Sequence, residues 1–190
     1  MTRKKAILAV VSSLFLLTLL TTTASAQTSP IDKGSINIGG MLSFQSYSGD
    51  LYGDGMSTTL LMPGFRYFIM RGLAVGADLM LIRQSGDDWS DTTTGIGPTV
   101  AYFFNTKSDQ FYPYVGLRLQ YYCLSSSWNS HSDSMTGFDF GFGGGLAYML
   151  KRNVAVTAEV GYHIQSLSYE GESESGSVLS FMVGLAVFLY

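Results

Sequence analysis

The chain has 190 residues, enough for one domain with a sizeable core, and its length does not require a second domain. Hydrophobic residues make up 46% and charged residues only 13%, with 22 glycines, 12 tyrosines and 12 phenylalanines. Acidic residues outnumber basic ones by fourteen to eleven, which disfavours a nucleic-acid partner. Cys123 is the only cysteine, so an intramolecular disulfide and a cysteine-based zinc site are excluded.

The N-terminus predicts a secretory signal peptide over residues 1–26. Three basic residues at positions 3–5 precede the apolar run 6–20, and Ala24-Ser25-Ala26 supplies the small residues of a cleavage site. The apolar run is shorter than the roughly 20 residues that a membrane-spanning helix needs. We therefore expect an exported chain whose mature part, residues 27–190, is a single domain.

Eight segments of the mature chain alternate between apolar and small or polar residues, as strands with two different faces do. In chain order they cover about residues 35–47, 58–69, 73–84, 94–104, 112–124, 138–153 (including a turn), 154–166 and 177–190. The last strand has two possible registers, with either Leu185 and its alternate neighbours outward or Phe188 and Tyr190 outward. The likeness of "GLAVFL" at 184–189 to "GLAYML" at 145–150 favours the first.

The smaller faces of these strands distinguish a membrane barrel from a soluble sandwich. A sandwich strand usually turns a face of Lys, Glu and Thr to water, whereas these faces carry Gly, Ala and Ser with isolated charges. Small residues suit a narrow barrel interior, and strands can cross a membrane only as a closed barrel. The sequence thus predicts an all-β fold, an eight-stranded antiparallel up-and-down transmembrane β-barrel.

The predicted connections alternate in length. Tight turns are expected near residues 70–71, 105–110 and 151–153, and longer loops at 48–55, 85–91, 125–136 and 169–176. Short turns on one rim and longer loops on the other are typical of bacterial outer-membrane barrels. Pro63 and Pro98 fall inside predicted strands, where each removes a ladder donor, so we expect a bulge or local distortion at both.

The hairpins "MPGFRYFIMRGLAVGADL" and "GPTVAYFF…YPYVGLRLQYY", with the signal and the aromatic C-terminus, resemble small outer-membrane β-barrel domains of Gram-negative bacteria, of the OmpA/OmpX and "porin family" type. The resemblance implies a place in the cell outer membrane among its lipids and lipopolysaccharide. It also implies that the barrel-assembly machinery reads the last strand and its terminal Tyr190 during insertion.

The inward faces carry a small set of charged and ionisable residues, namely Arg66, Asp78, Arg118, Asp139, Glu159 and His163. Arg118 and Glu159 are predicted to meet across Gly143, and Arg66 can pair diagonally with Asp78. Because eight strands leave an interior that side chains just fill, the structural interpretation is a packed lumen whose charges neutralise one another. The alternative is a narrow gated channel for small solutes, plugged by this network.

A lipid-hydrolase triad is the third alternative, built from His163, Ser166 and Glu159. In a regular strand His163 faces inward and Ser166 outward, so the set does not share a site. We therefore predict a non-enzymatic protein with no catalytic, cofactor or metal site, whose role is structural or in surface interactions.

The predicted loops are acidic, with Asp50, Asp54, Asp87, Asp88, Asp91, Asp133, Glu170, Glu172 and Glu174. Solvation, weak divalent-cation binding and cation bridges to lipopolysaccharide phosphates all fit these residues. Trp89 and Trp128 suit contacts with the lipid interface or with a surface protein partner.

Overall fold

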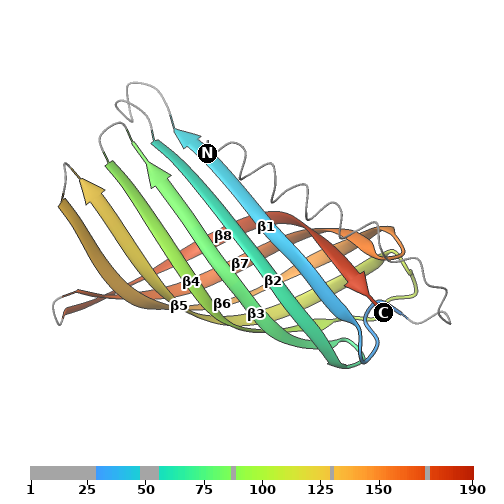
Figure 1. Ribbon diagram of the computed structural model, residues 1–190. Coiled ribbons are helices and arrows are strands. Elements are labelled where there is room, and N and C mark those ends of the chain that lie inside the picture. The colour runs from blue at the N-terminus through green and yellow to red at the C-terminus, as the bar shows by residue number, and fades with distance from the viewer. Residues whose placement is uncertain (1–28, 48–55, 87–88, 129–130, 170–171) are drawn as a thin grey trace, which may run out of the picture.

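The computed structural model describes residues 29–47, 56–86, 89–128, 131–169 and 172–190. These residues form eight strands that close into one barrel in chain order, each antiparallel to its neighbours (Figure 1). The prediction of an eight-stranded up-and-down β-barrel is therefore confirmed. Within these ranges, none of the chain forms a helix long and apolar enough to cross a membrane. The predicted signal peptide, 1–26, lies outside the described residues.

The strands are longer than the sequence pattern indicated. They are β1 (Ile36–Tyr47), β2 (Met56–Met70), β3 (Leu73–Ser85), β4 (Trp89–Phe103), β5 (Phe111–Trp128), β6 (His131–Lys151), β7 (Val154–Tyr169) and β8 (Glu172–Leu189).

The prediction of long loops at 85–91, 125–136 and 169–176 is wrong, because most of these residues continue the strands. The pairs Trp128↔His131 and Tyr169↔Glu172 leave only short connections. The continuing segments are rich in Ser, Thr and Asp on both faces, so they lack the apolar-to-polar contrast by which a strand is recognised. The predicted loop at 48–55 lies outside the described residues.

The outward and inward faces follow the predicted alternation. On β6, Phe140 and Phe142 are 43% and 46% exposed, while Asp139, the residue before Phe140, is completely buried. In β8, Leu185 is 60% exposed and Phe188 only 1%, which confirms the favoured register. The apolar side of each strand therefore forms the outer surface, and the small and polar side lines the interior.

Aromatic pairs lie near both ends of the outer surface. At the end with the β2–β3, β4–β5 and β6–β7 turns, which we call the turn end, Phe111 and Tyr148 have ring centroids 4.9 Å apart. Toward the opposite end, which we call the hairpin end, Tyr121 and Phe138 are 5.3 Å apart. Aromatic girdles in these positions are typical of barrels that span a membrane.

The segment before β1 helps to cover the turn end. Ile31 is fully buried there, and its carbonyl oxygen accepts a hydrogen bond from the Gly72 N–H at 2.8 Å. Gly72 ends the β2–β3 turn with a φ of 81°, a conformation that residues with a Cβ adopt at a cost. The glycine thus allows both the tight turn and its contact with the N-terminal segment.

Neither proline produces a bulge. Strand pairing is interrupted at Met62 and Pro63 between β2 and β3, and at Gly97 and Pro98 between β4 and β5, but the register is the same on both sides of each gap. The expected local distortion is therefore present without a shift. The register shifts that do occur adjoin the tight β2–β3 and β6–β7 turns.

One seam of the barrel is shorter than the others. β1 and β8 pair only from Ile36↔Leu189 to Leu42↔Val183, whereas β7 and β8 pair from Val154↔Val187 to Tyr169↔Glu172. Figure 1 shows β1 and β8 side by side near the C-terminus and diverging toward the hairpin end. The barrel is thus closed at the turn end, and its β1–β8 seam parts above Leu42 and Val183.

Candidate functional site

The lumen at the turn end is filled by an aromatic layer. Phe68 and Phe103 have ring centroids 5.4 Å apart, and Phe103 stacks on Tyr114 at 4.9 Å. Phe188 from β8 completes the layer, with its ring 6.1 Å from that of Phe103. All four rings are almost fully buried, so they pack against one another in the interior of the barrel.

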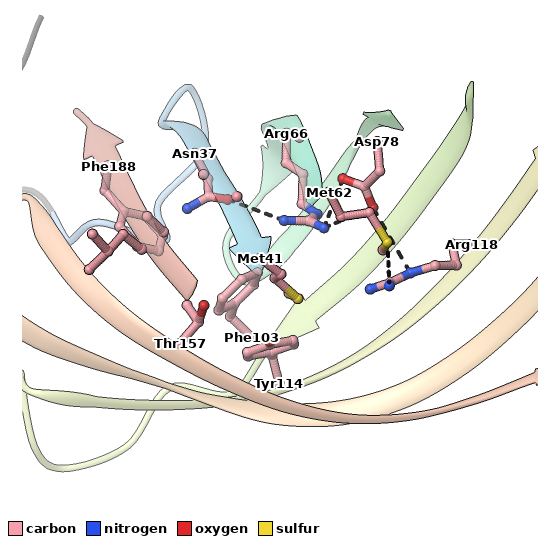
Figure 2. Close-up of a pocket in the computed structure, with 15 residues that line it drawn as sticks. Asn37, Met41, Met62, Arg66, Asp78, Phe103, Tyr114, Arg118, Thr157 and Phe188 are labelled. Atoms are coloured by element: carbon pink, nitrogen blue, oxygen red, sulfur yellow. Dashed lines mark hydrogen bonds and ion pairs between the residues drawn. The ribbon is translucent and has the colours of Figure 1, made fainter. Parts of the chain in front are cut away.

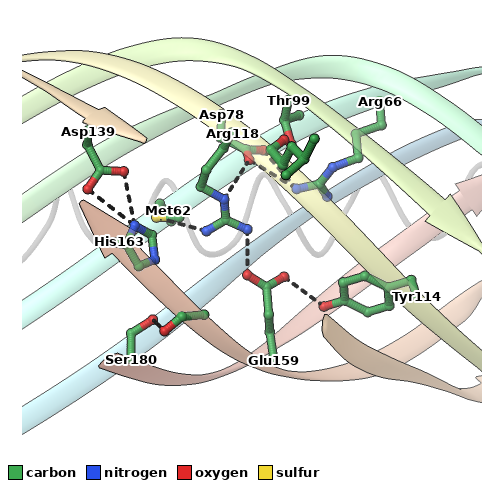
Figure 3. A network of polar contacts seen from close by, with 12 residues as sticks. Met62, Arg66, Asp78, Thr99, Tyr114, Arg118, Asp139, Glu159, His163 and Ser180 are labelled. Carbon is green, nitrogen blue, oxygen red and sulfur yellow. Dashed lines mark hydrogen bonds and ion pairs between the residues drawn. The ribbon is translucent and has the colours of Figure 1, made fainter. Parts of the chain in front are cut away.

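Above the aromatic layer lies a connected network of charged side chains (Figure 3). Arg66 Nη2 donates to both carboxylate oxygens of Asp78, at 3.0 and 3.1 Å. Arg118 donates through Nη2 to Glu159 Oε1 at 2.5 Å, and its Nε lies 4.0 Å from Asp78 Oδ2. Tyr114 donates its hydroxyl to Glu159 Oε2 at 3.0 Å. Two arginines and two carboxylates therefore balance each other in a buried row across the lumen.

Small residues on the neighbouring strands make room for this row. Arg118 pairs with Gly141 and Glu159 with Gly145, so the ion pair crosses β6 diagonally, with Gly143 between them. A Cβ on Gly141 would lie 2.8 Å from Arg118 Cγ, and one on Gly64 would meet the Asp78 carboxylate. The glycines that make the inner face look featureless in the sequence are what allow long charged side chains to lie inside.

A cavity of about 20 Å³ remains between the network and the seam (Figure 2). Asn37 Nδ2 and Arg66 Nε are buried there with no hydrogen-bond partner in the described part of the chain, although Arg66 Nη1 donates to Asn37 Oδ1 at 3.4 Å. A space of this size holds about one water molecule. The charged layer is therefore filled almost completely by the protein's own side chains.

A second polar cluster lies farther toward the hairpin end, on β5, β6 and β7. Asp139 is fully buried and accepts hydrogen bonds from Gln165 Nε2 at 3.0 Å and from His163 Nδ1 at 3.0 Å. Gln120, on the strand paired with Asp139, is also fully buried, and neither of its amide atoms has a partner among the described residues.

The residues of the alternative hydrolase triad do not come together. His163 contacts Asp139 rather than Glu159, and Glu159 is held by Arg118 and Tyr114. Ser166 contributes its backbone oxygen to a hydrogen bond from the Tyr122 hydroxyl.

Methionines form a third, apolar layer between the charged network and the hairpin end. Its buried members are Met41, Met62, Met80, Tyr122 and Met182, with Leu60, Ile82 and Leu167 partly buried against them. Met62 Sδ lies 3.9 Å from Arg118 Nη1, so the methionine layer rests directly on the charged one. The sequence analysis did not recognise this layer, because methionines scattered over four strands have no spacing that links them.

Two further predicted features have different outcomes. Tyr190 is 41% exposed and donates its hydroxyl to the Arg152 carbonyl at 2.7 Å, and its part in assembly stays a prediction. Asp50, Asp54, Asp87, Asp88 and Glu170 lie outside the described residues. In the ranges that are described, His, Cys, Asp and Glu form no group of three or more suited to a metal ion.

Comparison with known families fits this geometry. The model of the family described as outer membrane protein beta-barrel domain matches residues 12–187. The chain belongs to this family, and its place is the cell outer membrane. No curated protein matches the chain.

Solved structures show the same fold. Neisserial surface protein A is 19% identical, with a TM-score of 0.54 over 82% of this chain and 97% of that one. The outer membrane protein OprG from Pseudomonas aeruginosa is 15% identical, with a TM-score of 0.50 over 86% of this chain and all of that one. At these identities the likeness establishes the barrel, and it does not assign a role.

Proposed function

We propose that this protein is a non-enzymatic outer-membrane barrel with a closed lumen, which contributes to the integrity of the envelope or to contacts at the cell surface. The observation that carries the proposal is the stack of an aromatic layer and a balanced charged layer, with space for about one water molecule between the charged layer and the seam. Such a lumen is suited to holding a barrel together rather than to passing solutes.

The long hairpins support a surface role. The β5–β6 hairpin runs from Phe111 to Lys151, well beyond the 9 to 11 residues that a strand needs to cross a bilayer. With the turn end in the periplasm, as in bacterial barrels generally, this hairpin stands outside the cell. We propose lipopolysaccharide, and a surface protein not yet known, as the partners it meets.

Electrical recording in planar lipid bilayers tests the closed lumen. We expect no opening events for the unmodified protein and none for Arg118→Ala, because the aromatic layer of Phe68, Phe103 and Phe188 stays in place below the removed side chain. Openings in either form would support the narrow gated channel instead. That alternative is favoured by one feature, the unpartnered Arg66 Nε and Asn37 Nδ2 beside the cavity, where a small polar solute would find donors.

The envelope role needs a test in cells. A deletion strain should be more sensitive to detergents or should adhere less to surfaces, and a plasmid-borne copy should restore both properties. A strain unchanged in both respects would contradict the proposed role.

A further inference from the structure

The seam between β1 and β8 parts within the apolar outer surface, not above it. On β7, the other neighbour of β8, the outward residues change from apolar to polar between Ile164 and Ser166. On β8 the same change falls between Leu179 and Ser177, yet pairing with β1 already stops at Val183, which is nearer the turn end. The part of the seam next to Leu179 and Phe181 is therefore open at a level where lipid surrounds the barrel.

The side chains next to this opening are the most exposed apolar ones on β8. Leu179 is 74% exposed and Phe181 66%, compared with 48% for Val183 and 60% for Leu185 in the paired part. On the other side of the opening Phe44 of β1 is 65% exposed. Both edges of the gap thus continue the surface that contacts lipid.

The methionine layer adjoins the point where the seam parts. Met41 pairs with Gly184 just before the last pair, and Met182 is the first β8 residue beyond that pair. Both side chains face the interior, and Met62 and Met80 belong to the same buried cluster. Methionine side chains are flexible and polarizable, and they rearrange around apolar ligands more readily than branched side chains do. An apolar chain that entered from the side would meet an apolar, adaptable surface rather than the charged network.

The backbone at the gap selects a ligand with a polar end. The Phe188 N–H donates to Asn153 just before β7, and because backbone groups alternate along a strand, those of Leu179 and Phe181 point toward β1. β1 pairs with neither residue, and unpaired backbone groups facing hydrocarbon are costly. Hydroxyl, ester or amide groups of a lipid at this level would supply the missing hydrogen bonds.

We propose that the gap between β1 and β8 is a lateral binding site for one acyl chain of an outer-leaflet lipid. The chain lies against Met41 and Met182, and the lipid's ester, amide or hydroxyl groups meet the backbone of Leu179 and Phe181. This inference goes beyond the proposed function and does not depend on whether the lumen conducts. It requires only the membrane barrel and the orientation given above.

Paired cysteines test whether the seam is open. In a Cys123→Ser background, Phe44→Cys with Phe181→Cys places two thiols opposite each other if the β1–β8 register continues beyond Leu42. Ile38→Cys with Val187→Cys is the matched control, because these residues share the outward face and are paired. Mild oxidation should join the control pair at least about tenfold faster, since cysteines with Cα atoms more than about 7 Å apart cannot bridge without backbone movement.

Two results of this experiment would overturn the proposal. Equal rates for the two pairs would show that the seam is closed in the membrane. A disulfide between Phe181→Cys residues of two molecules, formed in place of the intramolecular one, would assign the open edge to a second copy of the chain.

Methionine methyl signals in NMR spectra test the occupant. The probe is stearate that carries a nitroxide near its methyl end, added to the protein in phosphatidylcholine nanodiscs. We expect saturable broadening of the Met41 and Met182 methyl signals, reversed by unlabelled stearate, and none for Met149 in the aromatic layer. Met70 is 54% exposed on the outer surface and serves as the control for unspecific contact with labelled lipid.

The outcome of the NMR experiment separates the possible occupants. If Met70 broadens while Met41 and Met182 do not, no acyl chain enters and the proposal is wrong. If a water-soluble gadolinium chelate broadens Met182 and the labelled stearate does not, the gap is filled with water, which also contradicts it.

Discussion

The two halves of the lumen are lined by alternate residues of the same strands, but they are closed in different ways. At the turn end every seam is paired, and aromatic rings and ion pairs fill the interior. Toward the hairpin end the filling is the methionine layer together with the polar cluster around Asp139, and the β1–β8 seam parts. The difference shows that side chains can fill an eight-stranded barrel along its whole length. The wall is fully closed only where strand pairing is complete and ion pairs and ring contacts hold the interior.

The largest expected effect is the loss of unfolding free energy when the buried charged network is broken, compared with the loss of an exposed ion pair. Arg118→Ala leaves Glu159 and Asp78 without a buried partner, and we expect it to lower the free energy of unfolding by about 3–5 kcal/mol. Arg71→Ala is the control, because the exposed Arg71–Asp32 pair at 3.3 Å should contribute only about 0–1 kcal/mol. Urea titration in detergent micelles, followed by heat-modifiable gel migration, measures both.

A second variant prevents a misreading of that result. Arg118→Met combined with Glu159→Leu removes both charges together, so no unpaired charge remains and most of the stability should return. If the double variant were as unstable as Arg118→Ala, the loss would come from packing, and the account of the network as a set of balanced charges would be wrong.

Two methionines compare the halves directly. Met149 is packed in the aromatic layer, so Met149→Ala should cost about 2–5 kcal/mol of unfolding free energy. Met182 is as deeply buried, but the β8 edge beside it is unpaired and can move inward to fill the space. We expect Met182→Ala to lose less unfolding free energy in the same titration. Equal losses would mean that the hairpin end of the barrel is as rigid as the turn end.

Substitution of two glycines by alanine should change the unfolding free energy least, and the two changes should differ in sign. A Cβ on Gly76 would run into the Phe65 carbonyl oxygen and lie 2.7 Å from the Arg66 Cα, so Gly76→Ala should destabilise by about 1–3 kcal/mol. Gly176 has nothing within 4 Å of that position. Gly176→Ala should therefore be neutral or stabilise by up to about 1 kcal/mol. Destabilisation by Gly176→Ala would show that the β8 edge is packed against something.

Much of the fold was predictable because one physical property repeats along the chain. The contrast between lipid outside and a narrow interior inside makes each spanning strand alternate, and this set the strand number, the faces and the register of β8 through Leu185 and Phe188. The contrast ends where both faces meet water, so the extensions of β5 and β6 around Ser125 and Thr136 were mistaken for loops.

The candidate site was predictable only in part, for a reason of geometry. The pairs Arg118–Glu159 and Arg66–Asp78 were predicted from the sequence, and the structure contains both. The contact of His163 with Asp139, and the gathering of the methionines, depend on how the strands are staggered around the barrel. Neither can be found without the pairing of all eight strands.

Amide hydrogen exchange along β8 tests the account most directly. In nanodiscs, the N–H groups of Leu185 and Val187, which face β1 in the paired part, should exchange slowly. Those of Leu179 and Phe181 face β1 where pairing has ended, and they should exchange faster by a large factor. Equal protection of all four amides would show that β1 and β8 are paired to the hairpin end, and it would contradict a seam that is closed at the turn end and open toward the hairpin end.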